Sequence, residues 1–279
     1  MLSSCGSQAT SAKTPQSKHA TAKPEKILGV PANSLSLGPL QSNGEIALLA
    51  GSEKSMGVFV FNLADSKELS SFSVSNAATS ITELPNGVIG VGLANGSAGA
   101  VDLYQISGAK VATVPMSGPV IGMSADGNGS TMLVLVGSAN VRAVAFLDTN
   151  TNQATSSIPL VSNTVSVCMS VGGNYLYGLE SGGMMDVYAV STAQKVGQFR
   201  VGHSGISTVM SPSGTQMFVL KGRNGIRNVA VVDLNTESDV RALPAPTGSV
   251  SLTTDLAGKS LIELATKSGK SNLQEWPVH

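Results

Sequence analysis

The sequence predicts an all-β protein, a β-propeller of six four-stranded blades, and three observations support this fold class. The 279 residues include 31 glycines and only 12% charged residues, which is typical of a globular chain with many turns and few long solvated helices. Glycine-containing turns between apolar runs recur at intervals of 40 to 46 residues. Within each interval the same order of four strand types is repeated. A fixed period of this length indicates a repeat architecture.

Six turns define the period. In each, small residues that tolerate a positive φ follow a first strand, such as 206–210, and let a hairpin reverse. The turn glycines are Gly44, Gly87, Gly127, Gly173, Gly214 and Gly258. This count gives six blades. Seven is the alternative, because a degenerate blade without such a glycine would not be counted.

The remaining strands follow in order. The second strands are nearly all apolar, as expected of strands that are covered on both faces. They span 46–49, 88–91, 132–135, 175–177, 217–220 and 261–264. Third strands follow at 57–63, 101–106, 141–147 and 229–234. The fourth strands are shorter and more polar, as at 195–199, which suits an outer edge.

Ring closure is also predicted from the sequence. The final repeat ends with its third strand at 272–279 and has no fourth. The segment 26–32 is similar to fourth-strand endings such as 111–116 and 156–160. We therefore expect this N-terminal strand to complete the last blade and remove the free edge of an open ring. The propeller domain is predicted to span residues 26–279.

Two repeats resemble a known group of propellers. The segments 146–153 and 232–236 look like a strand that runs into an Asp-Thr turn, and 211–215 looks like a Ser-Pro-Asp-Gly turn. These patterns resemble the YVTN and WD-repeat propeller families over about residues 27 to 279. The other repeats lack the Asp-Thr element, and the Trp-Asp dipeptide is absent. The resemblance implies the same fold class.

The N-terminal 25 residues are expected to form a lipobox-like start and a flexible stalk. Residues 2–6 resemble the bacterial lipobox, in which small residues precede a cysteine that is lipidated, here Cys5. Only Met1 precedes Leu2, whereas a complete signal has basic and apolar segments upstream. Residues 7–26 have almost no large apolar side chain and so cannot offset their ordering entropy. The resemblance implies an exported protein of the bacterial cell envelope, at the periplasmic or cell surface. An incidental cysteine in a disordered tail is the alternative.

Bulk charge and cysteine content exclude several classes of function. Lys+Arg and Asp+Glu both number 17, so no global attraction to nucleic acid is expected. Cys5 and Cys168 are too few for a disulfide framework or a zinc site of several thiolates, and Cys168, in the alternating run 164–169, is expected to be a buried structural thiol. No apolar run is as long as a membrane-spanning helix, so any membrane attachment is expected through the lipid alone.

Motifs for catalysis or cofactor binding are weak. The three histidines, His19, His203 and His279, have no metal-ligand spacing, and no metal or cofactor is expected. Ser107 and Lys110 match a Ser-x-x-Lys pattern, but they fall on a hairpin turn where no helix would align them. We interpret this match as chance.

One surface shows a charge bias. In an antiparallel blade, the second-to-third turns and the loops between blades emerge on one face, and the other hairpins emerge on the opposite face. The candidate binding residues on the first face are Lys54, His203, Lys221, Arg223, Arg227, Lys267 and Lys270. The opposite face carries Glu45, Asp65, Glu68, Asp126, Asp148, Asp233, Glu237, Asp239 and Asp255. The simpler interpretation is that these are solubility charges on exposed turns.

These observations predict a non-enzymatic envelope lipoprotein that acts as a scaffold for protein interaction or ligand binding. Its basic loops would meet an anionic protein, glycan or lipid headgroup surface. A propeller hydrolase, lactonase-like, with a site at the central channel is the first alternative; for it the inner strands offer Glu83, with Asp126 and Asp255 at their ends. A structural subunit of an envelope complex is the second.

Overall fold

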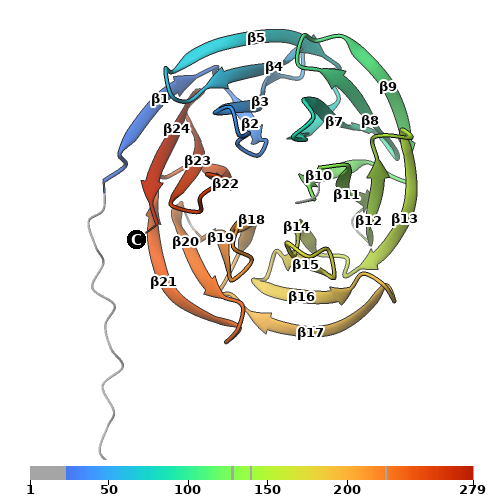
Figure 1. Ribbon diagram of the computed structural model, residues 1–279, viewed down its shortest axis with the longest axis vertical. Helices are drawn as coiled ribbons and strands as arrows, with labels where there is room; N and C mark the ends of the chain where they lie inside the picture. The colour runs from blue at the N-terminus through green and yellow to red at the C-terminus, as the bar shows by residue number, and fades with distance from the viewer. Residues whose placement is uncertain (1–22, 127–128, 139, 224, 279) are drawn as a thin grey trace, which may run out of the picture.

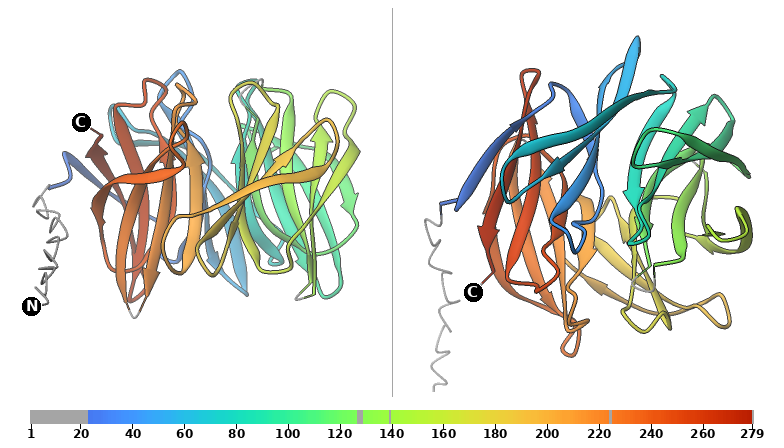
Figure 2. Two further views of the ribbon diagram at one scale, coloured as in Figure 1. Left: turned by 90° about the horizontal axis from the view of Figure 1, so that it is seen from below. Right: turned by 45° about the horizontal axis from the view of Figure 1, so that its top comes forward.

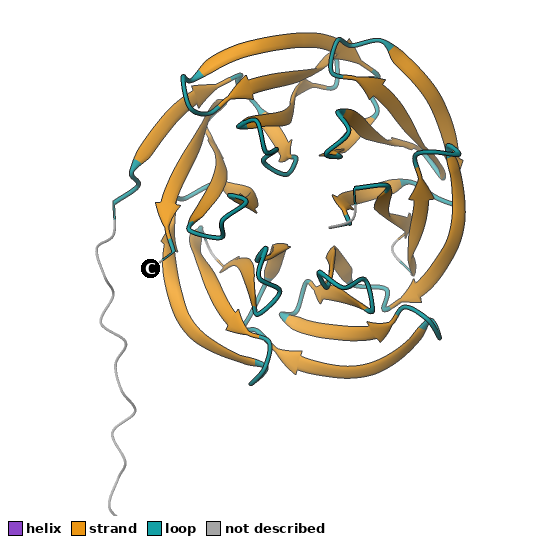
Figure 3. Cartoon of the chain, viewed as in Figure 1, coloured by secondary structure: helices purple, strands orange, loops and turns teal. Residues whose placement is uncertain are grey.

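The computed structural model describes residues 23–126, 129–138, 140–223 and 225–278, and within these ranges all regular structure is β. The 24 described strands form six separate four-stranded antiparallel sheets. The sheets are arranged as blades around a central axis (Figure 1), with loops only at their ends (Figure 3). The predicted propeller of six blades is confirmed, and the alternative of seven is wrong.

The strands are numbered in chain order. Blade 1 consists of β2 (Ser34–Leu37), β3 (Glu45–Ser52), β4 (Ser55–Asn62) and β5 (Lys67–Val74). Blade 2 consists of β6 (Ala78–Glu83), β7 (Val88–Asn95), β8 (Ala98–Gln105) and β9 (Lys110–Met116). Blade 3 consists of β10 (Val120–Ala125), β11 (Thr131–Ser138), β12 (Val141–Asp148) and β13 (Gln153–Leu160). Blade 4 consists of β14 (Thr164–Met169), β15 (Tyr175–Glu180), β16 (Met184–Ala189) and β17 (Gln194–Arg200). Blade 5 consists of β18 (Gly205–Met210), β19 (Gln216–Arg223), β20 (Ile226–Asp233) and β21 (Ser238–Ala245). Blade 6 consists of β22 (Ser249–Thr254), β23 (Ser260–Lys267), β24 (Lys270–Pro277) and β1 (Lys26–Val30).

The core lies between neighbouring blades. The first strand of each blade lies at the axis, and the fourth runs along the circumference (Figure 1). The second strand is covered on both faces, so that in β3 the four residues from Ile46 to Leu49 are all fully buried. In the outer strand β5, exposed and half-buried residues alternate instead. The apolar second strands and polar fourth strands of the sequence follow from these two positions.

The blades carry bulges that the sequence did not predict. In the first strand of every blade the register with the second strand shifts by one residue. The extra residues are Leu35, Thr79, Ile121, Val165, Ile206 and Val250. A second bulge lies in the outer strand of blades 1 to 5, where the extra residues are Leu69, Val111, Thr155, Val196 and Val240. Bulges in an outer strand twist the edge and hinder pairing with another chain.

An N-terminal strand closes the ring, as predicted. β1 pairs antiparallel with β24, from Lys26 opposite Glu275 to Val30 opposite Ser271. The strand ends at Val30 rather than Ala32, because the next residues turn into β2 and Asn33 has a φ of 58°. Blade 1 is joined to blade 6 by further bonds: Ser34 N donates to Ser271 Oγ at 3.0 Å, and Thr266 Oγ1 donates to Ser34 O at 2.7 Å.

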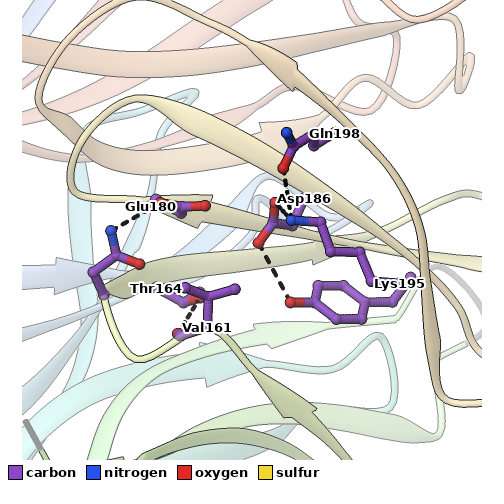
Figure 4. A network of polar contacts seen from close by, with 8 residues as sticks. Val161, Thr164, Glu180, Asp186, Lys195 and Gln198 are labelled. Carbon is purple, nitrogen blue, oxygen red and sulfur yellow. Dashed lines mark hydrogen bonds and ion pairs between the residues drawn. The ribbon is translucent and has the colours of Figure 1, made fainter. Parts of the chain in front are cut away.

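Ion pairs with a buried aspartate link strands within blades 2 and 4. In blade 2, Asp102 Oδ1 lies 2.8 Å from Lys110 Nζ. In blade 4, Asp186 Oδ1 lies 2.6 Å from Lys195 Nζ, and the Asp186 side chain is fully buried (Figure 4). In both blades the aspartate comes from the third strand and the lysine from the fourth. The Tyr188 hydroxyl also donates to Asp186 Oδ2 at 3.4 Å, and Lys195 donates to Gln198 Oε1 at 2.8 Å.

Candidate functional site

The ring has two loop faces, which are seen at its two rims in the side view of Figure 2. We call one the inter-blade face, because it carries the loops between blades together with the turns between second and third strands. The other, the hairpin face, carries the turns between first and second and between third and fourth strands. All seven predicted basic residues lie in or next to loops of the inter-blade face of blades 1, 5 and 6 or, for His203, between blades 4 and 5.

Five of these residues are exposed: Lys54, His203, Arg223, Lys267 and Lys270. Lys267 and Lys270 lie directly opposite each other at the end of the hairpin formed by β23 and β24. Like charges in that arrangement repel each other. A bound anion would relieve this repulsion, so blade 6 offers a local reason for anion binding.

Lys221 is placed differently from the sequence interpretation. Its Nζ lies 2.8 Å from Asp239 Oδ2 and donates to Val201 O at 2.7 Å, and its side chain is only 14% exposed. The sequence assigned Asp239 to the opposite face. Because the outer strand β21 runs along the circumference (Figure 1), its first residues are not confined to the hairpin rim. Lys221 is therefore neutralised by an ion pair and contributes little free charge.

Glycine makes room for the Lys221 side chain. Gly202 has a φ of 117°, and a Cβ at this position would lie 2.7 Å from Lys221 Nζ. The inter-blade loop that carries His203 is thus shaped by the Lys221 side chain and its ion pair with Asp239. Arg200 Nη1 donates to Gly202 O at 3.3 Å and adds a basic side chain at the same loop.

Arg227 is half-buried, and the equivalent arginine of blade 3, Arg142, was not among the candidate residues predicted from the sequence. Arg227 lies opposite Gly222, whose missing side chain leaves space for the arginine stem. Arg142 holds the same position in blade 3, opposite Gly137. The Nε atoms of both arginines are buried without a hydrogen-bond partner. The sequence did contain a signal for this equivalence, because in both blades a glycine is followed by a short turn, an aliphatic residue and the arginine.

A central channel of about 460 Å³ runs between the six inner strands. Its wall combines aliphatic side chains with small hydroxyls. The residue after each inner bulge is serine in five blades and glycine in blade 3: Ser36, Ser80, Gly122, Ser166, Ser207 and Ser251. Two of these serines accept hydrogen bonds from the next blade, Ser36 Oγ from Ile81 N at 3.3 Å and Ser166 Oγ from Thr208 N at 3.1 Å. The serine ring thereby links neighbouring inner strands.

Among the described residues that line this channel, the charged ones are three acids, Glu83, Asp126 and Asp255. They are the same acids that the sequence offered for a propeller hydrolase. Asp126 Oδ1 accepts from Gly129 N and Thr131 N, and Asp255 Oδ1 accepts from Lys259 N and Ser260 N. These two aspartates fix the hairpin turns of their blades. Only Glu83 lacks such a role.

Glu83 is a buried carboxyl at the end of β6. The residue is 1% exposed, and its Oε2 atom has no hydrogen-bond partner in the described structure. Burial, and to a smaller extent the charge of Glu45, raises the pKa of Glu83 to about 7. Within the described ranges, no cluster of three or more His, Cys, Asp or Glu side chains is arranged to hold a metal ion.

The remaining predicted features have separate outcomes. Cys168 is buried, as expected, and burial raises the pKa of its thiol to about 12, so it is not a thiolate at neutral pH. Cys5, His19 and the stalk up to residue 22 lie outside the described residues, as do Gly127 and His279. No helix capable of crossing a membrane is found in the described part of the chain.

Comparison with known proteins supports the fold. No family model and no curated protein matches the chain. Among solved structures, a chain of "Crystal Structure of Mitotic Checkpoint Complex" aligns with a TM-score of 0.66 and 16% identity, covering 100% of this chain and 99% of that one. A chain of "Kuenenia stuttgartiensis Hydrazine Synthase" aligns with a TM-score of 0.67 and 15% identity, covering 91% of this chain and 77% of that one. With the six-blade arrangement, these likenesses show a WD-repeat-like β-propeller fold.

Proposed function

We propose that this protein is a non-catalytic interaction scaffold of the bacterial cell envelope, anchored by a lipid on Cys5, which presents its inter-blade face to an anionic partner. Rigid β-propellers commonly serve as interaction scaffolds, with the partner bound by exposed loops. The similarity to a chain of a mitotic checkpoint complex supports the general role in protein binding. A non-enzymatic role is favoured because two of the three channel acids are bonded to turns.

The basic patch on blades 5, 6 and 1 carries the proposal. Its exposed members are Arg223 in blade 5, Lys267 and Lys270 in blade 6, and Lys54 in blade 1. These blades are contiguous in the ring (Figure 1), and the opposed pair Lys267 and Lys270 has no acid across the strand. We commit to an anionic protein surface as the partner; an anionic glycan or lipid headgroup is a different outcome of the test below.

Removing the exposed charge of the patch should weaken partner capture. We expect Arg223→Ser, Lys267→Ser and Lys270→Ser, combined, to reduce recovery of a partner protein in a pull-down from envelope extract by at least about tenfold, because each removed charge weakens attraction to an anionic surface. The matched control is Lys67→Ser, which removes an exposed lysine at the hairpin-face end of blade 1 and not from the patch. Recovery of the partner by the triple variant equal to that by the wild type would refute the patch. If the wild-type protein binds only anionic vesicles or glycan beads and captures no protein, the partner is a lipid headgroup or a glycan instead.

The lipid anchor has a test of its own. In native cells supplied with a clickable fatty acid, the wild-type protein should carry the label and sediment with membranes, and Cys5→Ser should do neither. Cys168→Ser is the matched control, because it removes a buried thiol and should keep both properties. A labelled Cys5→Ser protein, or an unlabelled wild-type protein, would contradict the anchor without affecting the basic patch.

A further inference from the structure

We propose that the hairpin-face end of the central channel binds a primary alkylammonium group, with the Glu83 carboxylate pairing with the nitrogen and the apolar wall holding the alkyl chain. This site lies at the end of the channel away from the basic patch, and it does not depend on the proposed anionic partner. Its ligand chemistry is opposite in sign to that of the inter-blade face.

An unpaired acid in the wall is the first observation. Glu83 lines the channel, is 1% exposed, and keeps Oε2 without a hydrogen-bond partner in the described structure. Its neighbours across the blade boundary in blade 1 do not satisfy it: Gln41 Nε2 donates to the Glu83 backbone oxygen at 3.3 Å, and Glu45 is another acid. A buried carboxyl without a partner is costly. Glu263 is another such carboxyl but is not among the described residues that line the channel, so Glu83 is the one placed to meet a ligand there.

The sign of the local charge favours a cation. Among the described residues that line the channel there is no lysine, arginine or histidine, whereas Glu83, Asp126 and Asp255 all lie near the hairpin face. Like charges in a cavity with low-dielectric walls focus the field on a counter-ion. An anionic or zwitterionic ligand would have no basic residue to meet.

The rest of the wall selects the kind of cation. Met123, Met169 and Met210 line the channel and offer flexible side chains that adapt to an unbranched alkyl chain. No aromatic side chain is among the described lining residues, so the wall lacks the cage that quaternary ammonium groups prefer. No described acid cluster suits a metal ion. A primary ammonium on an aliphatic chain fits both the acid and the wall.

Calorimetric titration with n-hexylamine at pH 8 tests the site. We expect one molecule of amine per chain, no binding of hexan-1-ol, and binding at least about tenfold weaker for Glu83→Gln, because the amide removes the charge that pairs with the nitrogen. Glu68→Gln is the matched control, since Glu68 is an exposed acid of an outer strand and its loss should leave the affinity unchanged. Wild-type affinity in Glu83→Gln, or equal binding of the alcohol, would overturn the proposal.

The wild-type protein alone provides a second test that does not depend on a variant. Because the pKa of Glu83 is about 7, its ionised fraction falls about tenfold between pH 8 and pH 6. The affinity for hexylamine, which stays protonated throughout this range, should weaken by about the same factor. An affinity that does not change with pH would contradict pairing with Glu83.

Two sources share this chemistry, a free amine and a lysine side chain of a partner protein. A short peptide with one lysine, and the same peptide with acetyl-lysine, separate them. Displacement of hexylamine by the lysine peptide alone would identify a protein lysine as the natural occupant. Binding of hexylamine without displacement by either peptide would identify a small amine. Absence of binding by both hexylamine and the lysine peptide would refute the site.

Discussion

A chain that begins at Pro31, without residues 1–30, should lose the stability of the closed ring. The truncation removes β1, whose five residues pair with β24, and it exposes the outer edge of that strand. Leu28 and Val30 also leave the core cluster shared by blades 6 and 1. Burial of two aliphatic side chains and a short ladder of hydrogen bonds together contribute about 4 kcal/mol or more.

Thermal unfolding is the appropriate measurement. For a domain of this size, a loss of about 4 kcal/mol lowers Tm by about 10 °C. The matched control is a chain that lacks only residues 1–22, which keeps every described strand and should keep the wild-type Tm. Leu28→Asp in the full-length chain should reproduce part of the loss. Equal Tm values for the two truncated chains would show that β1 does not stabilise the ring.

Substitution of Glu263 by glutamine should stabilise the protein at pH 8 and have little effect at pH 4.5. Glu263 lies on β23, the second strand of blade 6, and is fully buried. Burial raises its pKa from 4.5 to about 7, although the nearby Ser249 and Trp276 side chains lower it. Neither carboxyl oxygen has a partner with hydrogen-bond geometry in the described structure.

The sign of the pH dependence follows from that shift. Between pH 4.5 and 7 the folded state holds a proton that the unfolded state has released, so the free energy of unfolding falls as the pH rises. A pKa change of this size corresponds to about 3 kcal/mol, lost progressively across that window and absent above pH 7. Glutamine carries no charge at any pH and therefore avoids this loss. The pKa of Glu83 is also raised to about 7, so its ionisation lowers the free energy of unfolding further over the same pH range.

Denaturant unfolding at several pH values checks this prediction. The wild-type protein should be more stable at pH 5 than at pH 8, and Glu263→Gln should remove about half of that difference. Trp276 is the single tryptophan, so its fluorescence should titrate near pH 7 in the wild type and not in Glu263→Gln. Glu53→Gln, at an exposed turn, serves as the control. An unchanged pH profile in Glu263→Gln would contradict the burial of an ionisable carboxyl.

The blades could be predicted because their turns and second strands leave local signals. A reversal between two strands needs glycine or another residue tolerant of positive φ, and Gly44, Gly87, Gly173, Gly214 and Gly258 all have positive φ. Complete burial of second strands makes them continuously apolar, as in 46–49. The missing fourth strand of the last repeat then indicated the closure by β1.

Features that depend on register or on neighbouring strands could not be predicted in this way. An inner bulge such as Leu35 adds one residue to a short strand, and no local pattern distinguishes it from a normal strand residue. The ion pair between Lys221 and Asp239 joins the second and fourth strands of blade 5, so loop position alone suggested two free charges. For Glu83 the sequence indicated its place on an inner strand, but its burial depends on packing against blade 1.

The pairing of β1 with β24 also imposes an order of events as the chain emerges. The chain appears from its N-terminus, at the ribosome or on the far side of a membrane after export, so β1 emerges before the other described strands and its partner β24 emerges last of them. Until then, five complete blades can form one after another from neighbouring strands, while Leu28 and Val30 of β1 lack the strand β24 with which they pair. The final step joins residues nearly a whole chain apart, which makes it slow by loop-closure entropy. We therefore expect the nascent protein to pass through an open, arc-shaped intermediate, and the exposed edges of that arc are where chaperones would bind.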